Sequence, residues 1–373
     1  MLKFLTAGES HGKALMGIVD GYPAGVRINI DDINYELKRR QIGYGRSKRM
    51  QIEEDRVEII SGVNDGLTFG APISFLIINK DYTLPNLPEI KFPRPGHADL
   101  VGGMKYNFRN LRLALERASA RETAARTVIG ALCKQFLKVF KISIFSHVIQ
   151  IGNVKIDKSV SLEKIPQLAE RSDLRCIDRN AEKKMKKLID NARKKGDSLG
   201  GVFEVVATGV PSGLGSYVQW DRRLDGLIAH AILSIPGVKA VEIGEGIKNI
   251  SLYGSQVQDE IFYSSKKGYY RKTNNAGGLE AGMTNGMPVI VRGYMKPIAT
   301  LSKPLSSVDI DSKKRKQAVK ERADITAVPS AGVVAEAMLA YIIMNAFLEK
   351  FGADCLSDIK NNYKNYISRL QKY

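Results

Sequence analysis

Residues 111–139 read LRLALERASARETAARTVIGALCKQFLKV, and FKISIFSHVIQIG follows directly at 140–152. Alanine recurs through the first stretch, and neither glycine nor proline interrupts its first two-thirds, which predicts one long helix. The second stretch is short and largely apolar, which predicts a strand. The chain therefore mixes helix and strand, and the segments on either side extend this mixture.

Short apolar segments with partial alternation and Gly, Pro or Asp breaks predict further strands. We place them at LKFLTA (2–7), LMGIVD (15–20), VEIIS (57–61), PISFLIINK (72–80), GVFEVVATGV (201–210) and KAVEIGEG (239–246). Helices are predicted at DDINYELKRR (31–40), at WDRRLDGLIAHAILSI (220–235) and within VPSAGVVAEAMLAYIIMNAFLEKF (328–351). Because helices and strands mix without strict β-α-β alternation, the pattern favours an α+β fold over a doubly wound parallel sheet.

No Pro/Ser-rich linker divides the chain, and no repeat of 20–50 residues recurs, so we expect one domain over residues 1–373. Two segments differ in composition: a basic, helical excursion at about 159–200 and a polar helical tail from about 354. Residues 247–293 are rich in Gly, Asn, Tyr and Ser, and we expect a long loop region there.

The 373 residues are 44% hydrophobic and 26% charged, and they carry a net charge of +18. This balance favours anionic partners: nucleic acid, membrane headgroups or small polyanionic ligands. The lysine-rich clusters near 183–195 and 313–320 have no interleaved aromatic residues for base stacking, which is typical of solvated faces. The arginines instead concentrate in a few glycine-rich stretches.

No stretch approaches about 18 uninterrupted apolar residues, and the N-terminal MLKFLTAGESHG lacks a long apolar run. Neither a membrane span nor a signal peptide is therefore expected. Cys133, Cys176 and Cys355 are far apart and show no metal-ligand spacing. We expect no metal site, no disulfide framework and a cytoplasmic protein.

GESHG at 8–12 fits G-x-S-x-G, the pattern of the nucleophile elbow in serine hydrolases. An elbow normally follows several strands of a parallel sheet, whereas this serine is the tenth residue. No HGGG-type oxyanion segment is present, and no histidine has an obvious acidic partner in the expected order. The alternative is a strand-end turn in which His11 and Ser10 serve only as caps.

Two arginine-rich stretches and one histidine turn suit an anionic ligand. In KRRQIGYGRSKR (38–49), a glycine loop can bring several arginines onto one phosphate or carboxylate; the alternative is a solvated basic loop or a nucleic-acid contact. In FPRPGHADLVGGMKY (92–106), His97 sits in a rigid turn near Asp99 and can act as a proton donor, or else has only a structural role. In LERASARETAARTVIGA (115–131), Arg117 and Arg121 share a helical face, unless Glu116 and Glu122 pair with them locally.

Two further stretches combine glycines with charged residues. NNAGGLEAGMTNGMPVIVRGYMKPIATL (274–301) has glycines that permit close backbone approach, and Lys296 and Thr300 can hold a phosphate; an ordinary Gly-rich loop is the alternative. KERADITAVPSAGVVAEAM (320–338) places Arg322 and Asp324 just before an apolar helix, where a helix-flanking salt bridge is the alternative.

Taken together and in this order, the six stretches resemble the chorismate synthase family over roughly 350 residues. RPGHADL, LERASARETA, NNAGGLEAGM, MKPIATL and ERADITAVP are specific as a set. The resemblance implies a β-α-β sandwich of antiparallel sheets around helices, in a homotetramer. It also implies conversion of 5-enolpyruvylshikimate 3-phosphate to chorismate and phosphate by a 1,4-anti elimination. That reaction requires reduced FMN, for which NADPH is a candidate reductant.

The resemblance assigns roles to particular residues. The substrate-binding residues it implies are Arg40, Arg46, Arg49, Arg94 and Arg121, of which Arg40 and Arg46 are also implied for NADP. The implied flavin contacts are Arg117, Ala118, Ser119, Pro236, Gly237, Ala281, Lys296, Pro297, Ile298, Ala299, Thr300 and Arg322. His11 is implied as the acid for the departing phosphate and His97 as the neighbour of flavin N1, while Asp324 with Ser10 and Ser119 would relay a proton near N5.

The sequence departs from the family pattern in two places. KYNFRNLRLALERASAR has Asn107, Phe108 and Asn110 where many relatives have Gly, His and Asp. Ala281 replaces a usual glycine in the flavin set. A nucleic-acid-binding protein is the alternative to this enzyme that the net charge suggests, although no recognised nucleic-acid-binding module is present.

Overall fold

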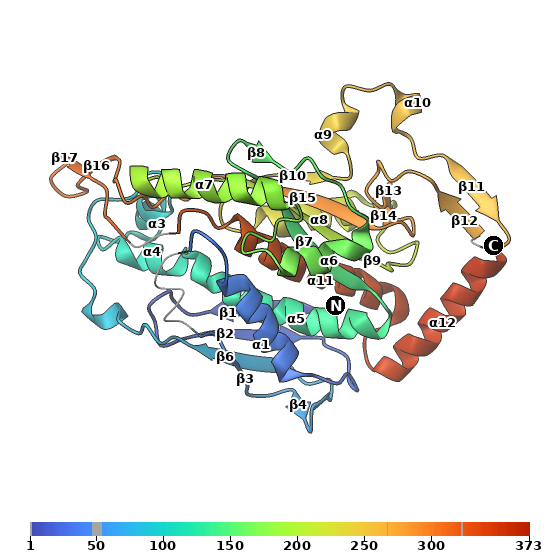
Figure 1. Ribbon diagram of the computed structural model, residues 1–373. Coiled ribbons are helices and arrows are strands. Elements are labelled where there is room, and N and C mark those ends of the chain that lie inside the picture. The colour runs from blue at the N-terminus through green and yellow to red at the C-terminus, as the bar shows by residue number, and fades with distance from the viewer. Residues whose placement is uncertain (1, 47–53, 267, 322–323) are drawn as a thin grey trace.

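The structure is a computed structural model and describes residues 2–46, 54–266, 268–321 and 324–373 (Figure 1). Its first sheet has the strand order β1-β2-β6-β3, with every neighbouring pair antiparallel. In β2 the side chains of Leu15 and Val19 are buried, whereas Met16 and Ile18 are exposed on the other face. This alternation buries one face of the sheet and leaves the opposite face apolar and open. The strands are β1 (Lys3–Ala7), β2 (Ala14–Asp20), β3 (Val57–Ile59) and β6 (Ile73–Ile78).

The second sheet has the order β10-β15-β9-β7-β8 and is also antiparallel. Its central strand is buried on both faces, because helices pack against each side. Phe203 and Val205 belong to the main core, while Val206 packs in a smaller cluster beneath α6 (Ile165–Glu170). The strands are β7 (Ser143–Ile151), β8 (Val154–Lys155), β9 (Gly201–Thr208), β10 (Val238–Ile243) and β15 (Val289–Met295).

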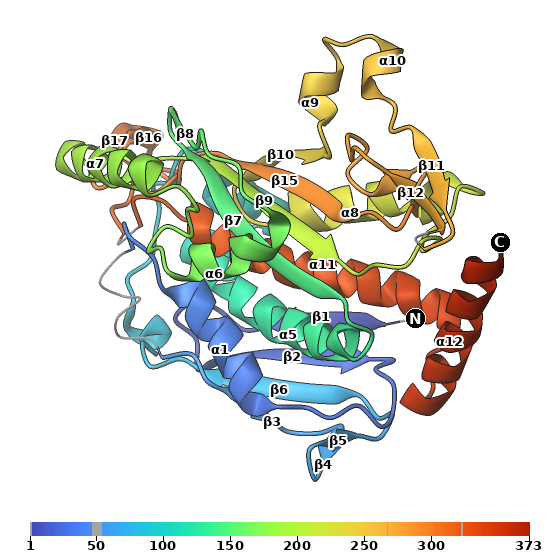
Figure 2. The ribbon, with the colours of Figure 1, turned by 45° about the vertical axis from the view of Figure 1, so that its right-hand side comes forward.

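Three helices fill the space between the sheets: α1 (Ile30–Gln41), α5 (Thr123–Val139) and α11 (Val328–Phe351) (Figure 2). The two antiparallel sheets around a helical layer confirm the α+β sandwich that the resemblance implied. α11 is long and apolar enough to cross a membrane, but 89% of its apolar window is buried inside the protein. α5 and α11 approach so closely that a Cβ at Gly130 would lie 2.1 Å from the Cβ of Ala337. Only glycine therefore fits at this crossing.

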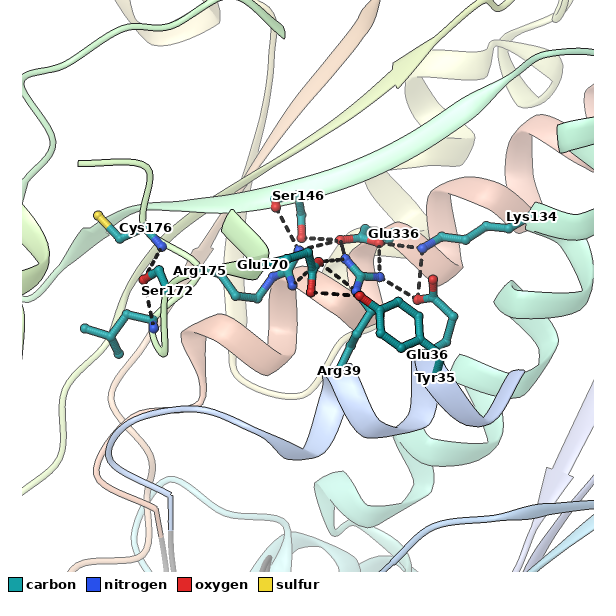
Figure 3. A network of polar contacts seen from close by, with 11 residues as sticks. Tyr35, Glu36, Arg39, Lys134, Ser146, Glu170, Ser172, Arg175, Cys176 and Glu336 are labelled. Carbon is teal, nitrogen blue, oxygen red and sulfur yellow. Dashed lines mark hydrogen bonds and ion pairs between the residues drawn. The ribbon is translucent and has the colours of Figure 1, made fainter. Parts of the chain in front are cut away.

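A buried group of charges joins α1, α5 and α11 to the second sheet (Figure 3). Glu336 of α11 is completely buried and accepts hydrogen bonds from both terminal nitrogens of Arg39. Burial disfavours its ionised form, but the neighbouring cations outweigh this and lower the pKa of Glu336. Paired charges of this kind fix the angle at which α1 packs on α11. The other members are Glu36, Lys134, Ser146, Glu170 and Arg175.

The prediction of one helix over 111–139 was wrong. The structure has α4 (Arg112–Arg117), an extended residue at Ser119, a short 3-10 turn η2 (Ala120–Glu122) and then α5. Ser119 has φ −63° and ψ 142°, and its hydroxyl accepts a hydrogen bond from the amide of Arg121. The serine thus caps the new turn. The break matters because it turns residues 118–121 toward a cavity.

The long loop predicted for 247–293 was also wrong in part. This segment forms two short helices and two hairpins before it enters β15, and it projects from one end of the molecule (Figure 2). Asp259 joins the two ends of the β11–β12 hairpin, because its carboxylate accepts hydrogen bonds from Thr273, Asn275 and Ala276. The elements are α9 (Gly246–Asn249), α10 (Gly254–Val257), β11 (Ile261–Ser264), β12 (Gly268–Arg271), β13 (Leu279–Glu280) and β14 (Met283–Thr284).

The basic excursion and the polar tail both contain the helices predicted for them. In α7 (Arg179–Lys195) Ala181, Met185, Ile189 and Ala192 are buried and the lysines face outward, so the basic excursion presents a solvated face. The polar tail forms α12 (Leu356–Lys372). Other elements are β4 (Val63–Asn64), β5 (Leu67–Thr68), η1 (Leu84–Asn86), α3 (Asp99–Tyr106), η3 (Leu162–Lys164), η4 (Trp220–Arg222), α8 (Leu224–Leu233), β16 (Ser306–Val308) and β17 (Arg315–Gln317).

Candidate functional site

A cavity of about 410 Å³ lies where six sequence stretches meet, among them the segment 235–239, which leads from α8 into β10. Its walls come from the end of α1, the turn before α3, the break between α4 and α5, and the segment after β15. The first turns of α11 close it with Ala327, Ser330 and Val334. The N-cap residue Ala327 has no side chain that can cap the helix, and because the first turn of α11 lines the cavity, the positive end of the helix dipole lies beside it.

Cationic side chains dominate the polar lining. Among the described residues that line the cavity, the only acid is Asp324. Apolar side chains, including Leu115, Ile235 and Ile298, line other parts of the wall. A ligand that suits this cavity is anionic and has a substantial apolar surface. The cationic residues are Arg40, Arg46, Arg94, Arg121, Lys239 and Lys296.

Arg40 and Arg121 share one buried carboxylate. Asp55 accepts from Arg40 Nη2 at 2.8 Å and from Arg121 Nη1 at 2.6 Å. Burial disfavours the ionised form of Asp55, but the two guanidinium groups more than compensate and lower its pKa. Within the described part of the chain, Arg40 Nε is buried without a hydrogen-bond partner. Two positive charges held by one negative charge leave an excess of positive charge at the cavity.

His97 is held by a buried carboxylate on its own turn. Its Nδ1 lies 2.6 Å from Oδ1 of Asp99, which is fully buried. Arg94 donates to both oxygens of the same carboxylate and, through Nη1, to Thr300 Oγ1 at 2.6 Å. Burial disfavours ionised Asp99, but these hydrogen bonds outweigh it and hold the pKa of Asp99 far below its usual range. Nδ1 also lies 2.9 Å from Arg94 Nη2, but its shorter contact is with the carboxylate. A carboxylate only accepts, so we assign the hydrogen to Nδ1 of His97, which leaves Nε2 to act.

Two other contacts involve residues that line the cavity. Arg46 Nη1 lies 2.6 Å from Asp324 Oδ2, so the predicted substrate arginine and the predicted relay acid form an ion pair. Lys296 donates to the carbonyl of Gly96 at 2.8 Å, which ties the turn of His97 to the segment after β15. Each of these cations keeps further donor capacity for a ligand.

The GESHG turn lies next to the cavity and does not line it. Its three carbonyls at Glu9, Ser10 and Gly12 all lie within reach of the amide nitrogen of Asn79. The carbonyl oxygen of the same amide accepts two hydrogen bonds from Arg121. Asn79 therefore connects the turn to the cationic wall.

Ser10 is buried, and its hydroxyl accepts a hydrogen bond from Ser119 Oγ at 3.1 Å. A hydrolase elbow needs an exposed nucleophile at a strand-to-helix turn, whereas this serine follows β1 and leads into β2. The geometry therefore favours a supporting role for Ser10. Because Ser119 lines the cavity, the two hydroxyls connect it to the GESHG turn.

A second cavity, of about 910 Å³, lies on the other side of the α4–α5 break. It shares Ala118, Ser119 and Pro236 with the first cavity. Arg117 lines only this second cavity, and its guanidinium donates to the carbonyls of Gly8 and Thr6. Residues implied for the flavin thus line both cavities, which share the wall formed by Ala118, Ser119 and Pro236.

Most sequence-predicted site residues come together. Ser10, His11 and Arg117 do not line the first cavity themselves, and Ala281 lies at the turn between β13 and β14 with φ 48°. Arg49 and Arg322 lie outside the described residues. The predicted residues that line the first cavity are Arg40, Arg46, Arg94, His97, Ala118, Ser119, Arg121, Pro236, Gly237, Lys296, Pro297, Ile298, Ala299, Thr300 and Asp324.

Sequence reasoning missed three residues that organise the site: Asp55, Asn79 and Lys239. It also missed that Glu116 binds a histidine. Lys239 occupies a register shift between β10 and β15, where an extra residue re-aims a side chain. The departures near 107–110 are accommodated locally. Asn107 takes the left-handed conformation (φ 56°) that ends α3, and Asn110 accepts from the amides of Ile90 and Arg112.

Comparisons with known proteins agree with one another. The family model described as chorismate synthase matches residues 2–348. A chorismate synthase of Caldicellulosiruptor saccharolyticus is 51% identical over 97% of this chain and 99% of its own length. That of Sulfurihydrogenibium sp. (strain YO3AOP1) is 54% identical over the full length of both chains. A solved crystal structure of chorismate synthase has a TM-score of 0.83 and 44% identity, and it covers 100% of this chain and 99% of that one.

Proposed function

The chain belongs to the chorismate synthase family, a family of lyases that catalyse the last step of the shikimate pathway, and we propose that the 410 Å³ cavity is its active site. The substrate proposed for it is 5-enolpyruvylshikimate 3-phosphate, with reduced FMN as the cofactor. The observation that carries the proposal is the charge of the lining. Six lysines and arginines face the cavity against a single described acid.

The substrate carries a phosphate and two carboxylates, and FMN adds another phosphate. Burying such charges requires matching cations, because an unpaired buried charge is costly. Arg40 Nε is buried without a partner among the described residues and offers a donor to an incoming anion. The N-terminal turn of α11, which lines the cavity, offers further positive potential.

The residues present also fit a flavin. Ala118, Ser119, Pro236 and Gly237 form a wall of small side chains against which a flat ring can lie. Lys296 and Thr300 lie on the opposite segment and supply polar contacts. When bound, reduced FMN supplies electron density that assists loss of the allylic phosphate.

The chain's own residues would position the substrate and move protons. The arginines hold the phosphate and carboxylates, and His11 donates a proton to the phosphate as the carbon–oxygen bond breaks. His97, with its Nδ1 hydrogen committed to Asp99, presents Nε2 to the cavity and holds a proton beside the cofactor. Asp324 and the Ser119–Ser10 pair provide the groups of a proton relay.

We also make proposals about the oligomeric state, domain organisation, location and flavin reductant of the protein. The open face of the first sheet exposes Leu5, Met16, Ile18 and Ile78, which supports association of copies into a homotetramer. We also propose one domain over residues 1–373, a cytoplasmic location, and NADPH, held near Arg40 and Arg46, as a reductant for the flavin. Nucleic acid and membranes are not proposed as partners.

Binding of FMN tests the assignment of the cavity. The purified protein is titrated with FMN under anaerobic conditions, with and without the phosphorylated substrate, and the flavin difference spectrum is recorded. We expect a strong difference spectrum in the presence of substrate, which Lys296→Ala weakens and Lys248→Ala, on exposed α9, does not. An unchanged flavin spectrum at saturating substrate would rule the proposal out.

A further inference from the structure

The side chain of Glu116, at the end of α4, is 1% exposed and is directed at the GESHG turn. Its Oε2 accepts a hydrogen bond from the backbone amide of His11 at 2.8 Å. Both carboxylate oxygens of Glu116 lie 3.0 Å from Nδ1 of His11. Its own backbone carbonyl accepts the amide of Ser10 at 3.2 Å. A single residue thus holds two consecutive amides and one imidazole.

The carboxyl group of Glu116 is ionised. Burial favours the neutral acid, but the hydrogen bonds from the ring and backbone of His11, with the charge of Arg112, outweigh this and lower the pKa of Glu116. Nη1 of Arg112 lies 3.5 Å from Oε1 of Glu116. Nη2 of the same arginine pairs with Glu321. A carboxylate has no hydrogen to donate, so Nδ1 of His11 must be the protonated ring nitrogen.

The other ring nitrogen faces a different acid. Nε2 of His11 lies 3.9 Å from Oδ2 of Asp81, which is too far for a direct hydrogen bond but close enough for attraction between charges. The imidazole therefore lies between two carboxylates, of which one binds it and the other leaves Nε2 open.

We propose that Glu116 is a positioning residue of the active site, which fixes the Nδ1–H form of His11 and makes Nε2 the atom that releases the proton. The proposal deepens the proposed function and rests on it, because it takes His11 as the acid for the departing phosphate. The proton that leaves Nε2 goes to the phosphate oxygen, and the neutral Nδ1–H ring remains hydrogen-bonded to Glu116 until Nε2 is protonated again.

The chain offers a well-matched pair of variants. Glu116→Gln keeps the shape and one acceptor for the amide of His11, but it loses the charge and offers an N–H group that the ring can accept from. Asn79 still holds the carbonyls of the turn, so the backbone keeps a second anchor. Glu122→Gln is the control: this acid lies six residues on, pairs with Arg126 and Thr6, and has no described contact with a histidine.

The first readout is independent of flavin and of turnover. The protein has four histidines, so imidazole nitrogen NMR on ¹⁵N-histidine-labelled protein gives few signals, and His11→Ala assigns the one of interest. We expect neutral His11 to be the Nδ1–H form in the unmodified protein and in Glu122→Gln, and a mixture of both forms in Glu116→Gln. Neutral His11 in the Nε2–H form, or no change in Glu116→Gln, would overturn the proposal.

The second readout separates positioning from binding. We expect Glu116→Gln to lower kcat about 10–100-fold with KM changed less than about 3-fold, as for other groups that orient a catalytic side chain. Glu122→Gln should keep both constants. A rise in KM with unchanged kcat would overturn the proposal. If His11→Ala turns over like the unmodified enzyme while Glu116→Gln still alters the tautomer, the acid role of His11 fails and the structural effect of Glu116 stands.

Discussion

Nδ1 of His97 lies 2.6 Å from Oδ1 of Asp99, and the carboxylate is completely buried. The same relationship joins His11 to Glu116 at 3.0 Å. Each predicted catalytic histidine is therefore oriented at Nδ1 by a buried carboxylate, and each presents Nε2 for chemistry. Two independent parts of the chain supply this arrangement, since one acid follows its histidine by two residues and the other lies on α4.

Asp99→Asn should lower kcat about 10²–10⁴-fold, because an amide in place of the carboxylate permits the wrong tautomer of His97. Phosphate release with reduced FMN measures this effect. Asp311→Asn, whose ion pairs among the described residues are with Lys91 and Arg109 at the surface, is the control and should leave turnover unchanged. Equal rates in Asp99→Asn and the control would argue against the role of the pair.

Stability should fall in acid. The folded-state pKa values of Glu336, Asp55, Asp99 and Glu116 are all lowered, so the native state binds fewer protons than the unfolded chain near pH 4. The stabilisation is therefore present above about pH 5, near the top of the unfolded carboxyl titration, and is lost progressively below it. Urea unfolding between pH 7 and pH 3 measures this. A free energy of unfolding that is constant over this range would contradict the pairing.

Gly130→Ala should destabilise the fold by about 1–3 kcal/mol, because its Cβ would overlap Ala337 where α5 crosses α11. Gly226→Ala is the matched control. A Cβ at this position in α8 would meet no atom within 4 Å, and we expect the substitution to be neutral or to stabilise by about 0.5–1 kcal/mol. Urea unfolding compares the two, and similar midpoints for both variants would refute the tight crossing.

Lys239→Ala should lower kcat/KM for the anionic substrate about 3–10-fold at low salt, because its charge stands at the cavity and attracts phosphate and carboxylates. The difference should shrink as salt rises, since the Debye length falls to about 3 Å at 1 M. Lys248→Ala removes a lysine on α9 that does not line the cavity and should show no such effect. A salt-independent loss in Lys239→Ala would point to a structural cause.

Local patterns predicted much of the fold. α1 and α11 lie within two residues of their expected ends, because an acidic start with a basic end and a long apolar run are visible in sequence. The break at Ser119 was not predictable. That residue leaves the helix where its hydroxyl meets Ser10, which is 109 positions away, and alanine content says nothing about such a contact.

The same difference between local patterns and long-range contacts explains which site residues could be predicted from the sequence. The arginine, glycine and histidine stretches could be recognised because their residues are neighbours in sequence, and Asp99 follows His97 by two positions. Glu116 acts on a histidine 105 positions away, and Asp55 joins two arginines from α1 and η2. Its neighbours in sequence suggested for Glu116 only a local salt bridge. The partners that orient the predicted catalytic groups become visible only when the layers are assembled.

Anaerobic phosphate release tests the central claim most directly. The unmodified protein, His11→Ala and His97→Ala are each given the phosphorylated substrate and saturating reduced FMN, with folding checked by circular dichroism. We predict that each variant remains folded and loses about 10²–10⁴-fold in kcat, as expected for removal of a positioned acid or base. Unmodified rates in either variant would contradict the role assigned to that histidine.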